Sequence, residues 1–354
     1  MIKVTVNASK KYDILIGEGL LDRAGELCRD TIGDCRVCVI TDDTVNALYY
    51  ERLEKSLVDA GYSPLCFVFP HGEGSKNIDT ISDILEFCAE NRLTRSDCLI
   101  ALGGGVVGDM TGFASAIYLR GIRFIQIPTT VLAAVDSSVG GKTGVDLKAG
   151  KNLCGAFHQP SLVICDNKTA ETLSPEIFAD GCAEVIKYGV INDRRFFDSL
   201  KDGIRSKLAT VIAECVRNKA RVVEDDEFDR GSRQLLNLGH TVGHAIELCS
   251  DLSISHGSAV AIGMVIVTRA AVTMGICPES GLYELIDILK AKALPTECHF
   301  SASELASVAA ADKKRAGGSI SVVLPYGIGD SRLLKLRVEE LEAFIDKGLK
   351  GIRA

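Results

Sequence analysis

The sequence has no uninterrupted apolar run long enough to span a membrane, so an integral membrane protein is not expected. It also lacks the opening of a secretory signal, because residues 1–7 alternate as a strand does, without a charged start and an apolar core. Internal repeats, low-complexity segments and long flexible linkers are absent as well. These absences predict a folded cytoplasmic protein without a membrane partner.

An excess of positive charge is missing too. The chain has 40 Lys and Arg against 47 Asp and Glu, which gives a net charge of -7. This balance argues against a nucleic-acid-binding surface. An anionic substrate must therefore be held by a local group of Lys and Arg side chains.

The 13 cysteines do not form the pattern of a disulfide framework, because their number is odd and they are scattered through apolar runs. In such runs a cysteine behaves as a small buried hydrophobe. Cys35 and Cys38 have the spacing of a redox motif, but they lead into a predicted strand and not into a helix N-terminus. A reducing compartment fits this pattern better than an oxidising one.

The length of 354 residues and a hydrophobic content of 47% are sufficient for two domains. In the first half, apolar strands at 37–40, 65–69 and 98–102 alternate with helical segments at 45–60 and 78–91, and further strands follow at 124–127 and 162–165. This alternation predicts an α/β domain with a largely parallel sheet over residues 1–170. Helical periodicity over 174–292 predicts a mainly α-helical domain over 171–354.

Half of the six histidines, namely His240, His244 and His256, fall within 17 residues of sequence. His240 and His244 are four residues apart and share one face of a predicted helix, which favours a metal site. Each of them could instead be a hydrogen-bonded core histidine. Glu184 lies in an apolar helical segment; it could pair with Lys187 across one turn, or complete a Glu-His-His ligand set with two of the histidines.

The sequence GGGVVGD at residues 103–109 follows a predicted strand and opens a predicted helix with the spacing G-x-G-x-x-G, which is typical of pyrophosphate binding. It departs from the dinucleotide-binding fingerprint, because it does not follow the first strand and no acid lies about 20 residues further on. A simple tight turn is the alternative. Asp42, at the end of the strand at 37–40, could bind a ribose hydroxyl or cap the next helix.

The segment 136–157 is too glycine-rich for a helix and too apolar for a free loop, and we interpret it as a ligand cradle. Lys142 and Lys151 would supply positive charge there without Walker spacing. Taken singly, either lysine could be a solvated surface residue.

Taken together, residues 103–112, 128–130, 136–157, 181–189, 236–247 and 256–264 resemble the 3-dehydroquinate synthase family of sugar-phosphate cyclases, with the motifs in the same order across nearly the whole chain. The resemblance implies conversion of 3-deoxy-D-arabino-heptulosonate 7-phosphate into 3-dehydroquinate and phosphate. This reaction of the shikimate pathway proceeds by transient oxidation by NAD, phosphate elimination, reduction and intramolecular aldol closure. NAD and a divalent metal, Zn²⁺ or Co²⁺, are the implied cofactors.

The resemblance also implies roles for individual residues. The metal ligands would be Glu184, His240 and His256. NAD would contact Asp42, Thr44, Glu73, Lys76, Gly104, Gly105, Val106, Asp109, Thr129, Thr130, Lys142, Lys151 and Thr172. The substrate and catalytic set would be Asp136, Lys142, Asn152, Lys187, Lys219, Asp229, Arg233, Asn237, His244 and one of Lys313 and Lys314. Arg120 would come from the neighbouring subunit, which implies a homodimer.

Three positions depart from the family pattern. Residues 174–178 lack the usual Arg and Glu, and Asp229 and Ser258 each stand where a Glu is usual. Rival interpretations are a related cyclase that makes 2-deoxy-scyllo-inosose or a valiolone, an NAD- and metal-dependent alcohol or glycerol dehydrogenase, and a non-catalytic NAD-binding or metal-storage protein. Retention of the implied phosphate-binding and acid-base residues favours the dehydroquinate interpretation.

Overall fold

The computed structural model describes residues 1–311 and 318–350, which form two compact units. Unit 1 contains Met1–Leu173 and Leu208–Phe228; unit 2 contains Ser174–Lys207 and the described residues from Asp229 onward. The division at residue 170 that we inferred from sequence assigns 208–228 to the second domain, whereas the fold places this segment in unit 1. Helix α8 (Leu208–Asp225) packs against the first two strands there, which explains its place.

Unit 1 is built on a seven-stranded sheet with the order β1-β2-β9-β6-β5-β3-β4. Its strands are β1 (Ile2–Asn7), β2 (Lys11–Gly17), β3 (Val37–Asp42), β4 (Leu65–Phe69), β5 (Cys98–Gly103), β6 (Arg123–Pro128) and β9 (Leu162–Asp166). Only β1 and β2 pair antiparallel, and every other pairing in this sheet is parallel. The predicted largely parallel α/β sheet is therefore confirmed.

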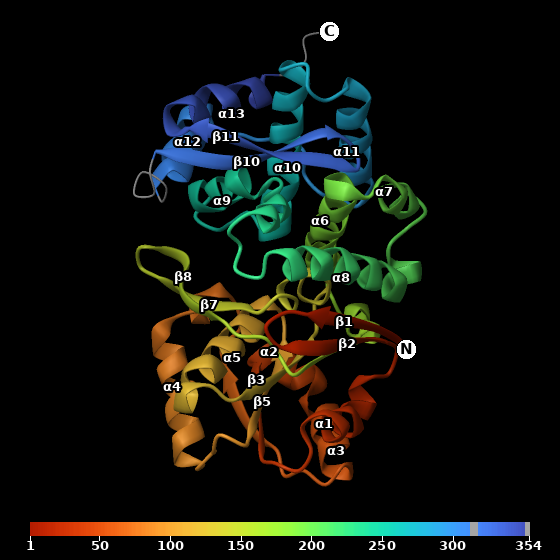
Figure 1. Cartoon of the computed structure of the whole chain (residues 1–354), viewed down its shortest axis with the longest axis vertical. Helices are drawn as coiled ribbons and strands as arrows, with labels where there is room; N and C mark the ends of the chain where they lie inside the picture. Colours follow the sequence, from red (N-terminus) through yellow and green to blue (C-terminus); the bar gives the residue numbers. More distant parts are fainter. Residues whose placement is uncertain (312–317, 351–354) are drawn as a thin grey trace. The chain divides into compact units, whose positions relative to one another are not determined.

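Helices cover both faces of this sheet (Figure 1). On one face lie α1 (Ala24–Ile32) and α3 (Glu51–Asp59), and on the other α4 (Ile78–Glu90) and α5 (Gly105–Ile117). Successive strand residues point to opposite faces, so Val39 packs with α1 and α3 while Ile40 packs with α4 and α5. This explains why the strands read as continuous apolar runs.

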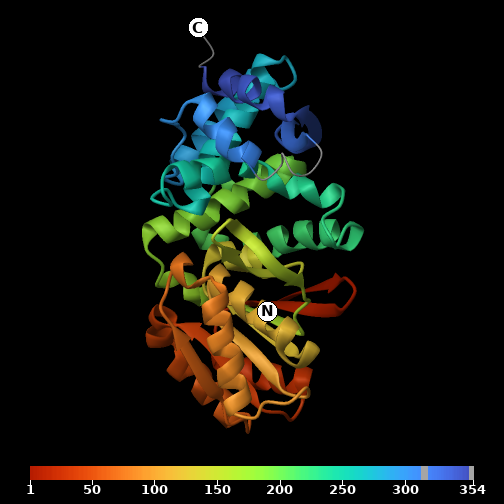
Figure 2. The ribbon, with the colours of Figure 1, turned by 90° about the vertical axis from the view of Figure 1, so that its left-hand side faces the viewer.

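Shorter elements complete unit 1: the helical turns Leu21–Arg23, Asp43–Val45, Asn46–Tyr50, Glu73–Ser75, Tyr118–Arg120, Ala133–Ser137 and Asn167–Glu171. From residue 142 on, the predicted cradle is an antiparallel hairpin of β7 (Lys142–Leu147) and β8 (Gly150–Phe157). Figure 2 shows this hairpin in yellow-green. Gly144 and Gly155 face each other across the hairpin. Glycines allow the two strands to approach closely here, because a Cβ on Gly155 would lie 2.1 Å from the carbonyl oxygen of Thr143.

Unit 2 is mainly helical, as predicted. It contains α6 (Pro175–Asn192), α7 (Arg194–Leu200), α9 (His240–Cys249), α10 (His256–Thr273), α11 (Glu279–Ala291), α12 (Ala302–Ala311) and α13 (Leu341–Leu349), with 3-10 turns at Arg205–Lys207, Ser232–Asn237 and Val338–Glu340. An antiparallel hairpin of β10 (Ser319–Gly327) and β11 (Asp330–Arg337) also belongs to this unit (Figure 1) and was not predicted.

Helix α10 is the centre of unit 2, where it packs against α6, α9, α11 and α13. By length and composition it is apolar enough to cross a membrane, although Thr268 and Arg269 interrupt its apolar run. However, 72% of this helix is buried inside the structure. Its hydrophobicity is accounted for by neighbouring helices that surround it.

Candidate active site

The three residues predicted to bind a metal lie together in unit 2. Oε1 of Glu184 is 3.5 Å from Nε2 of His240 and 3.5 Å from Nε2 of His256. Each residue offers a donor atom within 4.8 Å of the other two. Tetrahedral donors at roughly 2.1 Å from an ion are about 3.4 Å apart, so this set fits a divalent cation such as Zn²⁺ or Co²⁺.

These ligands converge because three helices pack closely. Glu184 lies within α6, and His240 and His256 are the first residues of α9 and α10. A Cβ on Gly263 would lie 2.1 Å from the carbonyl oxygen of Gly239, so the α10 backbone touches the start of α9. Gly239 itself has φ of +79°, a conformation that glycine adopts readily.

The start of α10 is also held against α6 by Asp180, which lies one turn before Glu184. Oδ1 of Asp180 accepts hydrogen bonds from the backbone N–H of Ser258 at 3.1 Å and from the hydroxyl of Ser255 at 2.5 Å. A Cβ on Gly257 would lie 2.3 Å from the carbonyl oxygen of Asp180. Helix α6 therefore carries one ligand and fixes the helix end that carries another.

Glu184 lies close to Lys187 and to both histidines, and the pKa values of the two histidines are shifted in opposite directions. Its side chain is fully buried, and Lys187 pairs with it one turn further along α6. Burial, and after it the nearby Lys187 ammonium, lowers the pKa of His240 to about 3. Burial also lowers the pKa of His256, but hydrogen bonds with Glu184 and Glu247 outweigh this and raise it to about 10.

Further predicted residues lie in the same unit. His244 follows His240 by one turn of α9, with ring centroids 5.4 Å apart, and its ring is 5.8 Å from that of His256. Arg233 and Asn237 lie on the 3-10 turn that precedes α9. Arg233 is only 2% exposed, which is unusual for an arginine and typical of a side chain with a specific role.

The predicted pyrophosphate-binding turn lies in unit 1 at the end of β5. Gly104 is the N-cap of α5, and Gly105 and Val106 follow in its first turn, so backbone N–H groups and the positive helix end are available to an anion. The N–H of Thr129 donates to the carbonyl of Gly103 at 3.0 Å. The ends of β5 and β6 therefore lie together, as expected for a cofactor site at the carboxyl edge of a parallel sheet.

Lys76, Asp109 and Asn152 form a hydrogen-bonded group in unit 1. Nζ of Lys76, which is 5% exposed, donates to Oδ2 of Asp109 and to Oδ1 of Asn152, both at 2.7 Å. Burial raises the pKa of Asp109, and the Lys76 ammonium opposes this effect. The structure thus brings two residues of the predicted NAD set into contact with one of the predicted substrate set.

The cradle lysines differ in their surroundings. Nζ of Lys151 lies 3.5 Å from Oε1 of Glu73, whereas Lys142 is exposed at the start of β7. Lys219, on α8, is 7% exposed; it pairs with the carboxylate of Asp136 and donates to its backbone carbonyl at 2.8 Å. The return of α8 to unit 1 thus brings a distant lysine to the predicted site.

The remaining predicted residues are more peripheral. Asp42 accepts from the N–H of Val45 at 2.8 Å, so it caps a helix as the alternative interpretation held. Thr172 contacts the hydroxyl of Tyr49, and Thr44 is exposed. Arg120 is exposed with φ of +68°. Lys313 and Lys314 lie outside the described residues.

Family models for the two parts of 3-dehydroquinate synthase match this chain, the N-terminal one over residues 66–180 and the C-terminal one over 181–315. A curated 3-dehydroquinate synthase from Enterococcus faecalis is 41% identical over 354 residues, covering 98% of this chain and 99% of that protein. The chain belongs to the 3-dehydroquinate synthase family.

Solved structures of other cyclases are also similar. A 2-deoxy-scyllo-inosose synthase in complex with carbaglucose-6-phosphate, NAD⁺ and Co²⁺ matches with a TM-score of 0.88 and 25% identity, over 98% of this chain and 100% of that one. The 2-epi-5-epi-valiolone synthase of Streptomyces hygroscopicus, with NAD⁺ and Zn²⁺ bound, matches with a TM-score of 0.87 and 26% identity, over 97% and 98%. Family membership and these matches confirm the predicted fold class.

The structure shows what surrounds the residues at the three departures from the family pattern. Ser174 caps α6, since its hydroxyl accepts from the N–H of Ile177 at 3.3 Å and Pro175 follows at the first helical position. Ser258 is part of the Asp180 contact described above. Asp229 has φ of +57°, which aspartate tolerates better than most residues.

Sequence reasoning gave no role to two residues that touch the site, Glu247 and Asp180. Glu247 lies one turn after His244, and this helical spacing alone could have drawn attention to it. No spacing signal exists for Asp180, because its partners are 75 and 78 residues away in the chain.

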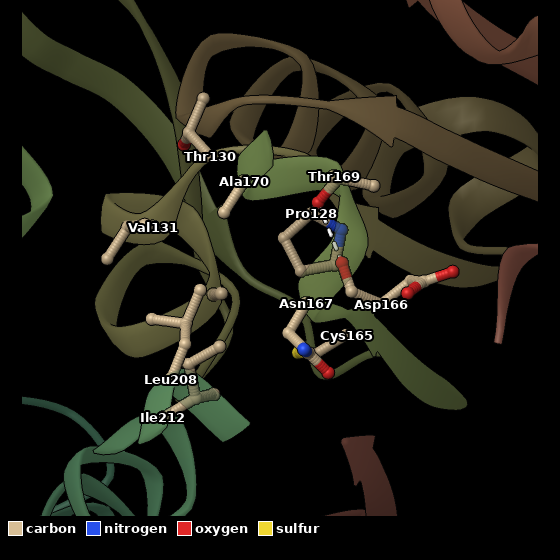
Figure 3. A pocket seen from close by; sticks show the side chains of 11 residues that line it. Pro128, Thr130, Val131, Cys165, Asp166, Asn167, Thr169, Ala170, Leu208 and Ile212 are labelled. Carbon is tan, nitrogen blue, oxygen red and sulfur yellow. Dashed lines mark hydrogen bonds between the residues drawn. The ribbon is translucent and has the colours of Figure 1, made fainter. Parts of the chain in front are cut away.

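A small hollow lies in unit 1 at the ends of β6 and β9 (Figure 3). Leu208 and Ile212 of α8 line it together with Pro128, Thr130 and Asn167. Its cavity volume is only about 10 Å³, which is roughly the space that one water molecule needs. It is too small for a whole dinucleotide and is lined mostly by apolar side chains.

Proposed function

We propose that this chain is a 3-dehydroquinate synthase, which converts 3-deoxy-D-arabino-heptulosonate 7-phosphate into 3-dehydroquinate and phosphate. The observation that carries the proposal is the convergence of Glu184, His240 and His256 in a chain that matches this family over nearly its whole length. The conversion leaves no net oxidation, so the cofactor is needed only in catalytic amounts.

When bound, NAD takes up and returns a hydride, and the divalent metal acts as a Lewis acid on substrate hydroxyl groups. Glu184, His240 and His256 are proposed to hold the metal. The turn at Gly104 and Gly105, with Thr129 and Thr130, is proposed to hold the pyrophosphate of NAD, since its backbone N–H groups lie at a helix N-terminus. The proposed cofactor set is completed by Asp42, Thr44, Glu73, Lys76, Val106, Asp109, Lys142, Lys151 and Thr172.

The residues proposed to bind the substrate include several cations. The phosphate and carboxylate groups of the substrate would be bound and oriented by Lys187, Lys219, Arg233 and Asn237. In this orientation a phosphate oxygen of the substrate can accept the proton from its own C6. The other protons of the reaction would be moved by the imidazole of His244 and the carboxylate of Asp229. Asp136 and Asn152 would position the hydroxyl groups of the substrate.

Phosphate release from the heptulosonate phosphate, with NAD far below the substrate concentration, tests this proposal. We expect many turnovers per NAD, no accumulation of NADH, and loss of turnover with a chelator that is restored by Zn²⁺ or Co²⁺. Accumulation of NADH from a simple polyol would instead favour a dehydrogenase. Metal binding without turnover of any sugar phosphate would favour a storage role.

Similarity to the two solved cyclases supports a second candidate, cyclisation of a different sugar phosphate. The same assay with a hexose 6-phosphate or a seven-carbon ketose phosphate separates the two candidates. Higher kcat/KM for either of these than for the heptulosonate phosphate would replace the first proposal with the second.

We also propose that the chain forms a homodimer in which Arg120 acts in the site of its partner. Leu119 and Arg120 have φ of +49° and +68°, and such backbone strain is often kept where a side chain has a functional task. Light scattering should give twice the chain mass. Mixing Arg120→Ala with Lys219→Ala subunits should restore activity that neither variant has alone.

A cytoplasmic location is proposed from the cysteines, since none of the 13 forms a disulfide in the structure and eight are buried. Burial raises the pKa of Cys28 and of Cys165 to about 12, which keeps these thiols unreactive. Fractionation of the producing cells should place the activity with the soluble contents.

A further inference from the structure

A buried carboxylate outside the Glu184, His240 and His256 set contacts one of these proposed metal ligands. Glu247 lies on α9 and is 3% exposed. Its Oε2 atom lies 3.2 Å from Nδ1 of His256. The other ring nitrogen of His256, Nε2, faces Glu184.

The two ring nitrogens of a histidine cannot both offer a lone pair while the ring is neutral. An ionised carboxylate only accepts hydrogen bonds, so once the ring of His256 is neutral, as a metal ligand must be, the contact with Glu247 keeps the proton on Nδ1 and leaves the lone pair on Nε2. His240 shows the same arrangement, because its Nδ1 lies 3.1 Å from the carbonyl oxygen of Leu238 while its Nε2 faces Glu184. Both imidazoles therefore present the same nitrogen toward one carboxylate oxygen.

We propose that Glu247 is a positioning residue for metal binding, which selects Nε2 of His256 as the donor atom and fixes the orientation of its ring. This inference rests on the metal site proposed above. A carboxylate behind a ligating histidine raises its basicity and restricts its rotation, and loss of such a partner typically weakens metal binding by about 10–100-fold. Glu247 acts through His256 and is not assigned a contact with substrate.

The neighbours of Glu247 offer an alternative role, as a ligand of a second cation. His244, Glu247 and His256 also offer donor atoms that lie within 4.8 Å of one another, as ligands of a second cation would. That second site would need the Nδ1 lone pair of His256, which the first arrangement uses as a donor N–H. The two arrangements thus predict different stoichiometries, one ion or two ions per chain.

The experiment is a titration of the metal-free full-length chain with Co²⁺. Calorimetry measures the affinity and stoichiometry, and the visible absorption of bound Co²⁺ reports on its ligands. We expect one ion per chain in the wild type. Glu247→Ala should bind about 10–100-fold more weakly with a shifted absorption band. Glu247→Gln, which keeps an accepting oxygen without charge, should lie between the two. Glu304→Ala, an exposed acid of α12, is the matched control and should match the wild type.

Affinity and absorption of Glu247→Ala equal to those of the wild type would overturn the proposal, as would two ions per chain of which Glu247→Ala loses one. If Glu247→Ala does not fold, Glu247→Gln carries the test, and wild-type affinity with an unshifted band would overturn the proposal. Glu184→Gln and His240→Ala separate this outcome from failure of the metal site itself. If these two variants also bind Co²⁺ as the wild type does, the proposed metal site itself is wrong. If these two variants lose Co²⁺ binding while Glu247→Ala keeps it, only the role proposed for Glu247 is wrong.

Discussion

Oδ1 of Asp180, on α6, accepts a hydrogen bond from the backbone N–H of Ser258, in the first turn of α10, at 3.1 Å. Ser255 is the N-cap of α10, and a glutamate at position 258 would complete a capping box with it. This chain has serine there, and the N–H of Ser258, which would donate to the N-cap side chain in a capping box, donates instead to a carboxylate of the neighbouring helix. The start of the helix that begins with His256 is therefore capped by a tertiary contact.

Asp180→Ala should lower the free energy of unfolding by about 0.5–2 kcal/mol, the usual cost of losing a helix cap, as measured by urea denaturation. Ser258→Glu in the wild-type background should also destabilise the chain, because it adds a second carboxylate next to Asp180. The double variant Asp180→Ala/Ser258→Glu should recover part of the stability through a local capping box. Additive losses in the double variant would contradict this explanation.

Removal of the metal should abolish turnover while the fold remains. The helices that carry Glu184, His240 and His256 are held by an apolar core around α10, and the site is a small part of a large unit. Far-ultraviolet circular dichroism with and without chelator is the measurement. A collapse of the helical signal on chelation would show that the metal maintains the fold.

Lys142→Ala should reduce kcat/KM for the heptulosonate phosphate far more than Lys148→Ala does, with both variants as stable as the wild type. Both lysines are exposed, but Lys142 begins β7 whereas Lys148 lies in the turn between β7 and β8. The comparison is made by steady-state kinetics at fixed NAD. Equal activities would show that the hairpin is not the ligand cradle.

Gly263→Ala should destabilise unit 2 by about 1–3 kcal/mol or more, because the new methyl would meet the carbonyl oxygen of Gly239, and overpacking of this kind carries such a cost. Gly327→Ala is the control, since a Cβ there meets nothing within 4 Å. Thermal melts of both variants test this. A melting temperature of Gly263→Ala at the wild-type value would mean that α9 and α10 separate easily.

The stability of unit 2 should depend on acid pH through Asp198. The Arg194 guanidinium and then the Lys201 ammonium lower the pKa of Asp198 from 3.8 to about 2. A depressed carboxyl pKa stabilises the fold above the unfolded value, and this contribution is lost as the pH falls through the folded value. The difference in melting temperature between wild type and Asp198→Asn should therefore shrink from pH 5 to pH 3. Asp287→Asn, on the exposed side of α11, is the control, and a constant difference for Asp198→Asn would contradict the prediction.

The elements of unit 1 could be predicted because their strands are apolar, most of them buried on both faces, and are separated by amphipathic helices with clear periodicity. The strands predicted at 37–40, 65–69 and 98–102 lie within β3, β4 and β5. The β10–β11 hairpin escaped prediction, and the return of α8 to unit 1 had no local signal. Both depend on packing partners that are distant in the chain.

The sequence by itself determined the residue types of the site, the glycine turn before α5 and the spacing of His240 and His244, because these follow from local backbone geometry and side-chain chemistry. Only the tertiary structure decided that Glu184 faces both His240 and His256. It also decided that Lys76 joins Asp109 to Asn152. Finally, it decided that Glu247 contacts His256 and that Asp180 holds the helix that begins with His256. These contacts connect residues from different elements, so they depend on how the elements pack.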